Sequence, residues 1–174
     1  MRVITGSLRG KRLVTLEGLD VRPTSDKVKE AVFSIIQFDL PAAQVLDLFA
    51  GSGQLGIEAI SRGAKSCVFV DRSRDAVDIV RKNVDSCRIS SQARIVNSDS
   101  IDYLRRAAKN KAEFDIVFAD PPYERGLLER VLPLISEVIK PLGTVVCEHE
   151  SVSCPRQSAG FAFTANTATA KKSL

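Results

Sequence analysis

The chain has 174 residues, of which 44% are hydrophobic and 26% charged, and its formal net charge is +4. This balance is typical of one folded domain with a core of its own. No apolar run is as long as a membrane-spanning helix and residues 1–10 lack a signal-peptide pattern, so we expect a cytoplasmic protein with no membrane partner. Four cysteines without a C-x-x-C pair and a single histidine predict neither a metal site nor a disulfide framework.

The positive charge is concentrated at the start of the chain. Residues 1–30 hold seven basic and four acidic side chains, whereas the rest of the chain holds 18 basic and 17 acidic ones. Charge gathered on one face steers a nucleic acid toward a binding site. Residues 2–5 and 11–15 predict a hairpin around Gly6 and Gly10, and its basic tip is either a solvated edge or an RNA-contacting extension.

A helix is predicted to follow this hairpin. Residues 22–25 (Arg-Pro-Thr-Ser) offer a capping hydroxyl at its start, and the helix should end near Asp39, before Pro41. Its apolar stripe is predicted to consist of Val28, Ala31, Val32, Ile35 and Ile36.

From residue 44 onward, strand patterns alternate with helix patterns. The predicted strands are 45–49, 66–70, 93–96, 114–118 and 143–147, and a helix follows each of the first four. Ser73 and Ser98 are predicted to cap the second and third of these helices, and the fourth is predicted to bury Val138. The alternation predicts an α/β fold with a mostly parallel sheet covered by helices on both faces.

These patterns divide the chain into three parts. Residues 1–40 are the N-terminal hairpin and helix extension, residues 41–154 are the core, and residues 155–174 are a tail rich in Ala, Thr and Ser. The tail alternates only weakly, around Phe161 and Phe163, so we expect it to be frayed or disordered.

A glycine-rich turn links the first core strand to the helix after it. Gly51, Gly53 and Gly56 have the spacing that allows a tight turn and lets a ligand approach the backbone closely. Asp71 follows the second strand, twenty residues after Gly51, where a carboxylate can accept from two ribose hydroxyls. The pattern predicts a cofactor that contains adenosine, and its spacing fits both dinucleotides and S-adenosylmethionine (SAM).

Three features favour SAM. Asp47 ends the first strand, where its carboxylate suits a sulfonium or ammonium group and would repel a pyrophosphate. Asp99, in the polar cluster after the third strand, either accepts from the adenine amine or caps the next helix. The fourth strand ends in a segment suited to an amine and offers nothing that would handle a hydride.

That segment is Asp120-Pro121-Pro122-Tyr123. The prolines end the strand, so a carboxylate, a proline carbonyl and an aromatic ring are held beside one another at the ligand-binding edge of the sheet. These groups suit a flat substrate that carries an NH₂ group. The aromatic ring would stack on the substrate, and the two oxygens would accept hydrogen bonds from its NH₂. The alternative is a Pro-Pro turn in which the Asp side chain bonds its own backbone.

Four motifs in this order, VLDLFAGSGQLG, VFVD, NSDS and FADPPY, resemble motifs I to IV of class I SAM-dependent amino-methyltransferases. RVITGSLRGKRL and RPTSDKVKEAVFSII resemble the N-terminal extension of one family among them, which methylates the exocyclic N2 of a guanine in bacterial 16S ribosomal RNA. The resemblance covers about residues 1–150. It implies a Rossmann-like fold, SAM as the cofactor, 16S rRNA or the small ribosomal subunit particle as the partner, and a monomer without a metal.

The resemblance also implies site residues. The base-binding residues would be Asp120, Pro121, Pro122 and Tyr123. The residues that bind or border SAM would be Asp47, Phe49, Ala50, Gly51, Gly53, Gly56, Asp71, Arg72, Asp99, Ser100, Arg22, Pro23 and Thr24. The RNA contacts would be Arg9, Lys11, Arg12 and Arg125. The family closes its sheet with an antiparallel strand pair, and because residues 155–174 carry that pattern faintly we expect the last strand to be missing or badly formed.

Other functions use some of the same features. The segment 120–123 would also accept adenine N6 or another exocyclic amine of DNA or RNA, or a protein glutamine amide. A dinucleotide-binding oxidoreductase and a non-catalytic RNA-binding module are the alternatives from other classes. Covalent chemistry at Cys147 or Cys154 is not expected, because neither follows the fourth strand, and His149 is expected to have a structural or rim role.

Overall fold

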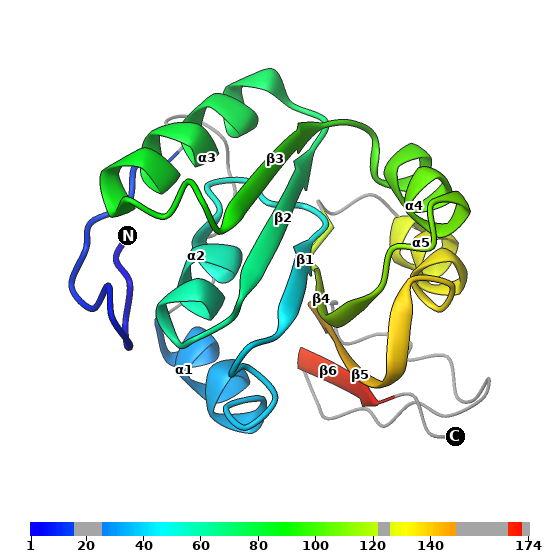
Figure 1. The fold of residues 1–174 in the computed structure, drawn as a ribbon, viewed down its shortest axis with the longest axis horizontal. Helices are drawn as coiled ribbons and strands as arrows, with labels where there is room; N and C mark the ends of the chain where they lie inside the picture. The colour runs from blue at the N-terminus through cyan, green and yellow to red at the C-terminus, as the bar shows by residue number, and fades with distance from the viewer. Residues whose placement is uncertain (16–25, 122–125, 149–166, 172–174) are drawn as a thin grey trace.

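The computed structural model describes residues 1–15, 26–121, 126–148 and 167–171. Its centre is a six-stranded sheet with the order β3-β2-β1-β4-β5-β6 (Figure 1). The strands are β1 (Gln44–Asp47), β2 (Ser66–Asp71), β3 (Ala93–Asn97), β4 (Phe114–Ala119), β5 (Ile139–Glu148) and β6 (Thr167–Lys171). The first five strands are parallel to one another, and β6 is antiparallel to β5. The predicted α/β fold is therefore confirmed.

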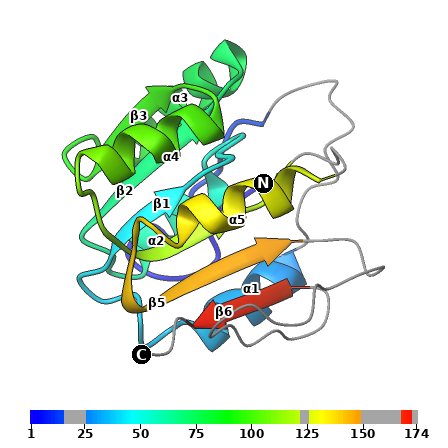
Figure 2. The same ribbon diagram turned by 90° about the vertical axis from the view of Figure 1, so that its right-hand side faces the viewer.

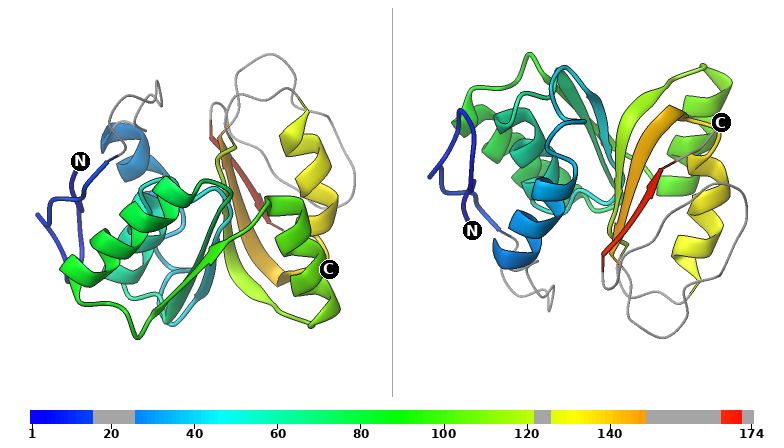
Figure 3. Two further views of the ribbon diagram at one scale, coloured as in Figure 1. Left: turned by 90° about the horizontal axis from the view of Figure 1, so that it is seen from above. Right: turned by 90° about the horizontal axis from the view of Figure 1, so that it is seen from below.

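Helices cover the sheet on both faces, as predicted. They are α1 (Asp26–Ile35), α2 (Gln54–Ser61), α3 (Arg74–Cys87), α4 (Ser100–Lys109) and α5 (Leu127–Ile135). Figure 3 shows α1, α2 and α3 on one side of the sheet and α4 and α5 on the other. Strand side chains alternate between these two layers: Val45 packs with the α1–α3 side, and its neighbour Leu46 with the α4–α5 side. Within the described ranges, no helix is both long and apolar enough to cross a lipid bilayer.

The end of the sheet differs from the prediction in two ways. β5 begins at Ile139 rather than at residue 143, and α5 ends at Ile135, so Val138 is buried outside a helix. The β4–β5 register shifts between Phe114 and Ile116. An irregularity of this kind interrupts the alternation of side chains along a strand, so the pattern of apolar residues does not predict the early start of β5.

The expectation that the last strand is missing was wrong. β6 pairs with β5 over five residues, from Thr144↔Lys171 to Glu148↔Thr167, and the two strands lie side by side in Figure 2. Main-chain hydrogen bonds hold an edge strand whatever its side chains, so small residues such as Ala and Thr are sufficient there. Residues 149–166 and 172–174 of the tail lie outside the described residues.

The predicted N-terminal hairpin is reduced to a single antiparallel bridge between Arg2 and Arg12. Val3 donates to the Lys11 carbonyl at 2.9 Å, and Leu13 to the Met1 carbonyl at 3.0 Å. The segment 1–15, called the arm below, does not form two full strands because other backbone groups of the arm bond side chains of α2 and α3 instead. Those contacts are described with the site.

The buried face of α1 also differs from the prediction. The predicted Val32, and Ile36 directly after the helix, are buried, whereas the predicted Val28, Ala31 and Ile35 are exposed, and Lys29 and Phe33 are buried in their place. Lys29 reaches the buried side because its ammonium donates to the Arg2 carbonyl at 3.2 Å. A lysine whose charged end is satisfied packs its aliphatic stem like an apolar side chain, and hydropathy alone does not predict this. The predicted start of this helix, residues 22–25, is not among the described residues.

Candidate functional site

Carboxylates gather where the central strands end. Asp47 is the last residue of β1 and Asp71 the last of β2, while Asp120 directly follows β4. β1 lies between β2 and β4 in the sheet and is parallel to both, so all three residues lie where the carboxyl ends of the strands meet, which is the edge of the sheet meant below. In open α/β sheets this edge is where ligands bind.

The glycine turn after β1 has the backbone that a close-fitting ligand requires. Gly51 (φ 54°) and Gly53 (φ 78°) are both in the left-handed region. A Cβ on Gly51 would meet no atom of the described residues within 4 Å, so within that part of the chain the backbone there faces open space. The Asp71 carboxylate anchors this turn, because it accepts from the Gly51 N–H and from the Ser73 N–H, each at 2.8 Å. Each of its oxygens keeps a second lone pair for a further donor.

Gly56 serves a different purpose from the other two glycines. A Cβ there would overlap Phe69 Cε1 and would lie 2.6 Å from Cys67 Sγ, so only glycine lets α2 pack this closely on β2. The close packing also brings the Gly56 N–H to Asp47, whose Oδ2 accepts from it at 3.0 Å.

Asp47 has a strongly perturbed carboxyl group. Its pKa is raised to about 7, chiefly because the side chain is buried; the hydrogen bond from Gly56 lowers the pKa, while the nearby charges of Asp120 and Asp71 raise it. Three carboxylates in close range repel one another unless one takes up a proton or a cation lies among them. The edge therefore has the electrostatics of a cation-binding site and not of a pyrophosphate site.

The raised pKa of Asp47 predicts a pH dependence of stability. Between about pH 4 and pH 7 this group carries a proton in the folded ligand-free protein but not in the unfolded chain, so the free energy of unfolding falls as the pH rises through that window. Asp47→Asn keeps an oxygen for the Gly56 N–H and cannot ionise. In denaturant unfolding, the free energy of unfolding of the variant relative to that of the parent protein should rise by a few kcal/mol from about pH 4 to pH 7. A constant difference across that range would contradict the assignment.

Asp99 caps α4, which was the second of its two predicted roles. Its Oδ1 accepts from the Ile101 N–H at 2.8 Å and from the Asp102 N–H at 3.3 Å. The prediction that Ser98 caps this helix was wrong: Ser98 Oγ instead donates to the Asp99 carbonyl and accepts from Arg106. A contact between Asp99 and adenine stays a prediction. The cap at Ser73 is confirmed, with its hydroxyl accepting from the Ala76 N–H at 3.3 Å.

The remaining predicted residues divide into placed and unplaced ones. Phe49 and Ala50 lead into the glycine turn, where the Ala50 N–H bonds the Val70 carbonyl at 3.0 Å. Ser100 is buried at the start of α4, Arg72 is exposed, and Asp120 and Pro121 are half-buried. Exposed basic side chains on the arm are Arg9, Lys11 and Arg12. Outside the described residues lie Arg22, Pro23, Thr24, Pro122, Tyr123, Arg125, His149 and Cys154.

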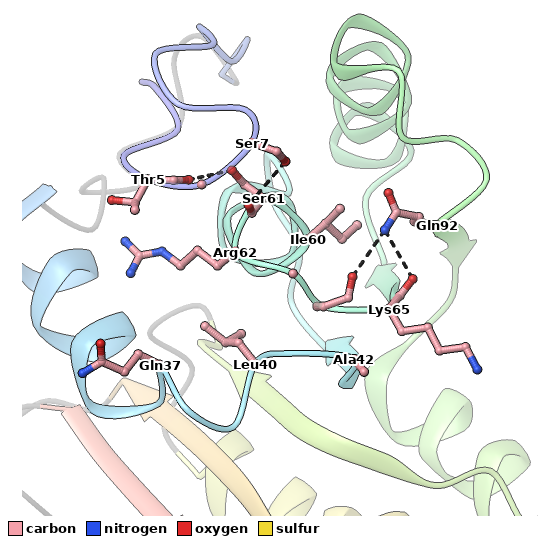
Figure 4. Close-up of a pocket in the computed structure, with 13 residues that line it drawn as sticks. Thr5, Ser7, Gln37, Leu40, Ala42, Ile60, Ser61, Arg62, Lys65 and Gln92 are labelled. Carbon is pink, nitrogen blue, oxygen red and sulfur yellow. Dashed lines mark hydrogen bonds between the residues drawn. The ribbon is translucent and has the colours of Figure 1, made fainter.

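Sequence reasoning missed a set of buried polar residues on α2 and α3 that hold the arm. Glu58 accepts from the Ile4 N–H at 2.8 Å and the Thr5 N–H at 3.0 Å. Ser61 donates to the Thr5 carbonyl at 2.6 Å and accepts from Leu8 (Figure 4). The available signal was a glutamate inside the otherwise apolar helix that follows the glycine turn.

Asn97 is a second missed residue, at the end of β3. Its side-chain amide donates to the carbonyls of Asp71 and Arg72, each at 3.0 Å. These bonds hold the turn after β2 against the end of β3, and so help fix the backbone beside the Asp71 carboxylate.

Cys147 lies close to Asp120 but has no nucleophilic character. Burial raises the pKa of its thiol to about 12, and the nearby charge of Asp120 adds to the rise. Since the thiolate is the nucleophile, a thiol held protonated is inert. This agrees with the expectation that the site does not use covalent cysteine chemistry.

A groove of about 920 Å³ lies at the opposite edge of the sheet from the three carboxylates. Its lining includes Ala42, Lys65 and Gln92, which stand just before the amino ends of β1, β2 and β3 (Figure 4). Arg62 borders it and is already engaged, with its Nε 2.8 Å from Glu58 and its guanidinium 4.8 Å from the Phe33 ring centroid. The groove is therefore separate from the candidate site.

Comparisons with known proteins agree with this geometry. The family model described as Conserved hypothetical protein 95 matches residues 1–174. The protein named "Putative rRNA methyltransferase YlbH" from Bacillus subtilis is 42% identical over 152 residues, which are 86% of this chain and 83% of that protein. "Ribosomal RNA small subunit methyltransferase D" from Haemophilus influenzae is 37% identical over 86% of this chain and 79% of its own length.

A solved structure shares the whole fold. The structure titled "Putative methyltransferase yhhF from Escherichia coli" superposes with a TM-score of 0.86 at 32% identity, covering 99% of this chain and 98% of that one. The predicted Rossmann-like methyltransferase fold is thereby confirmed. With the family model matched from end to end, the chain belongs to the Conserved hypothetical protein 95 family, together with the small-subunit rRNA methyltransferase D proteins that its motifs resemble.

Proposed function

We propose that this protein is a SAM-dependent rRNA methyltransferase that transfers a methyl group to the exocyclic N2 of a guanine in 16S rRNA. The observation that carries the proposal is the group of three carboxylates, Asp47, Asp71 and Asp120, around the open glycine turn. The names of the relatives support rRNA as the substrate class. We further propose that the protein acts as a monomer in the cytoplasm, on the free RNA or on the small-subunit particle.

The residues at the strand ends fit the cofactor. SAM has a sulfonium and an ammonium group, and Asp47 with Asp71 near it favours positive charge. Asp71 keeps acceptor capacity for ribose hydroxyls next to the turn that it anchors. The open space at Gly51 leaves room for a ligand against the backbone. Asp99 at the start of α4 is the proposed acceptor from the adenine amine.

The catalytic part of the proposal rests on Asp120 and Pro121. When bound, SAM supplies a methyl group activated by the positive sulfur. An aromatic amine is a poor nucleophile because its lone pair is delocalised into the ring. The Asp120 carboxylate and the Pro121 carbonyl would accept its two hydrogens and favour the geometry in which the lone pair leaves the plane of the ring. Positioning of this kind supplies most of the rate enhancement, and water takes the proton that the amine loses afterwards.

RNA contact is proposed for the arm and for residues 122–125. Arg9, Lys11 and Arg12 are exposed on the arm, as a phosphate-binding surface requires. Tyr123 is proposed to stack on the base once it has left the RNA helix, a step that costs a few kcal/mol. Arg125 would contact the RNA backbone beside it.

Calorimetric titration separates this function from a dinucleotide-dependent one. We expect the protein to bind SAM and not NADH, because the Asp47 carboxylate and its neighbours repel a pyrophosphate. Binding of NADH without binding of SAM would refute the proposal.

A further inference from the structure

One buried side chain links the arm to the glycine turn. Asn83 lies on α3 and is fully buried. Its amide nitrogen donates to the Val14 carbonyl at 2.9 Å and to the Ser52 carbonyl at 2.8 Å, and its oxygen accepts from the Val14 N–H at 2.8 Å. Both amide hydrogens and the oxygen are therefore used, and they hold two segments that lie 38 positions apart in the chain.

The two segments are functionally different parts of the protein. Ser52 lies between Gly51 and Gly53, at the centre of the proposed cofactor turn. Val14 is near the end of the arm, which carries the proposed RNA contacts, and its own side chain is 52% exposed. A second contact joins the same two segments, because Ser52 Oγ donates to Met1 Sδ at 3.8 Å. The geometry at Asn83 therefore allows the position of either segment to depend on the other.

We propose that Asn83 is a positioning residue that couples the arm to the cofactor turn, so that SAM bound at the turn helps to order the arm and an ordered arm strengthens SAM binding. The inference rests on the proposed function, since it needs the cofactor at the glycine turn. The coupling is reciprocal by thermodynamic linkage. An amide suits this place because it supplies two donors and one acceptor, whereas a carboxylate would face the two carbonyls with no hydrogen to donate.

Ser61 provides the matched control. It holds the same arm from α2, through Thr5 and Leu8, and neither of these two side-chain hydrogen bonds involves the glycine turn. If Asn83 only holds the arm in place, the Asn83→Ala and Ser61→Ala variants should change the affinity for SAM by the same factor. If Asn83 couples the two segments, its loss should weaken SAM binding much more than the loss of Ser61, which loosens residues 5–8 but leaves Val14 bonded to Asn83.

The experiment is a calorimetric SAM titration of the parent protein and both variants, with thermal unfolding recorded alongside. We expect Asn83→Ala to raise the Kd for SAM about fivefold or more, and Ser61→Ala to change it less than about twofold at a similar loss of thermal stability. Equal weakening in both variants, or no weakening in Asn83→Ala, overturns the coupling while leaving the cofactor assignment intact. Absence of SAM binding by the parent protein overturns both.

Hydrogen exchange on the parent protein tests the coupling without any variant, in case Asn83→Ala does not fold. The Val14 amide is bonded to Asn83, whereas the Ser7 amide is bonded to the Ser61 carbonyl at 2.8 Å. Saturating SAM should slow exchange of the Val14 amide several times more than that of Ser7. Equal slowing of the two amides, or none at Val14, would overturn the coupling.

Discussion

Asp120→Ala is expected to reduce methyl transfer by about 100-fold or more and to leave the affinity for SAM nearly unchanged. The reason is positional: Asp120 follows β4 and would hold the substrate amine, while Asp71 and the glycine turn on the other side of β1 would hold most of the cofactor. Single-turnover rates with saturating SAM, beside a SAM titration, measure the two effects separately. Equal loss of rate and of SAM affinity would refute this division of roles.

Two further variants sharpen that test. Asp120→Asn keeps the size and one acceptor oxygen, so it should lose less activity than Asp120→Ala. Asp78→Ala removes one negative charge from the exposed surface of α3, where Asp78 pairs with Arg81 at 2.8 Å. It should transfer methyl groups at the parent rate. Loss of rate in this control would mean that net charge, and not the Asp120 acceptor, sets the rate.

Gly56→Ala is expected to destabilise the fold although it replaces a glycine inside a helix. In an exposed helix the change would gain about 1 kcal/mol. Here the new Cβ would overlap Phe69 and Cys67, both fully buried, and overpacking of this kind costs about 1–3 kcal/mol or more. The free energy of unfolding from denaturant titration should fall accordingly, and the Asp47 carboxylate should lose part of its bond from the Gly56 N–H. A stabilised variant would show that α2 does not pack on β2 as described.

Gly51→Ala should weaken SAM binding more than it destabilises the fold. Its Cβ would meet no atom of the described residues within 4 Å, so the left-handed backbone is the main cost to stability, roughly 1–2 kcal/mol. The methyl group would instead occupy the open space where the cofactor is proposed to bind, and SAM affinity should fall by more than the stability change explains. The pair of variants thus distinguishes the glycine that permits packing from the glycine that permits binding.

The sequence predicted the elements that carry strong local signals. β1, β2 and β4 are short apolar runs between turn residues, and their observed ends lie within two residues of the predicted ones. The glycine turn, with the carboxylates of Asp47 and Asp71 beside it, could be predicted because the spacing of its glycines is itself the requirement of the turn. The choice of cofactor came from charge, since a buried carboxylate suits a cation and opposes a pyrophosphate.

What the sequence did not predict depends on long-range polar contacts. Glu58 bonds Ile4, 54 positions away, and Asn83 bonds Val14, 69 positions away. Nothing in the local pattern distinguishes these buried polar side chains from exposed ones. The hairpin is shorter than predicted because backbone groups of Ile4, Thr5, Leu8 and Val14 bond such side chains. The unpredicted burial of Lys29 on α1 has the same origin, because its ammonium bonds the Arg2 carbonyl, 27 positions away.

The central claim is that a planar nucleobase amine is held where β4 ends, facing a methyl donor held over the ends of β1 to β3. It is tested most directly by incubating the protein and SAM with small ribosomal subunits or 16S rRNA that lack the modification, followed by nucleoside mass spectrometry. We expect close to one N2-methylguanosine per 16S rRNA from the parent protein, and formation at least about 100-fold slower with Asp120→Ala. A methyl group found on adenine N6 or on a ring carbon, or no transfer at all by the parent protein, would contradict it.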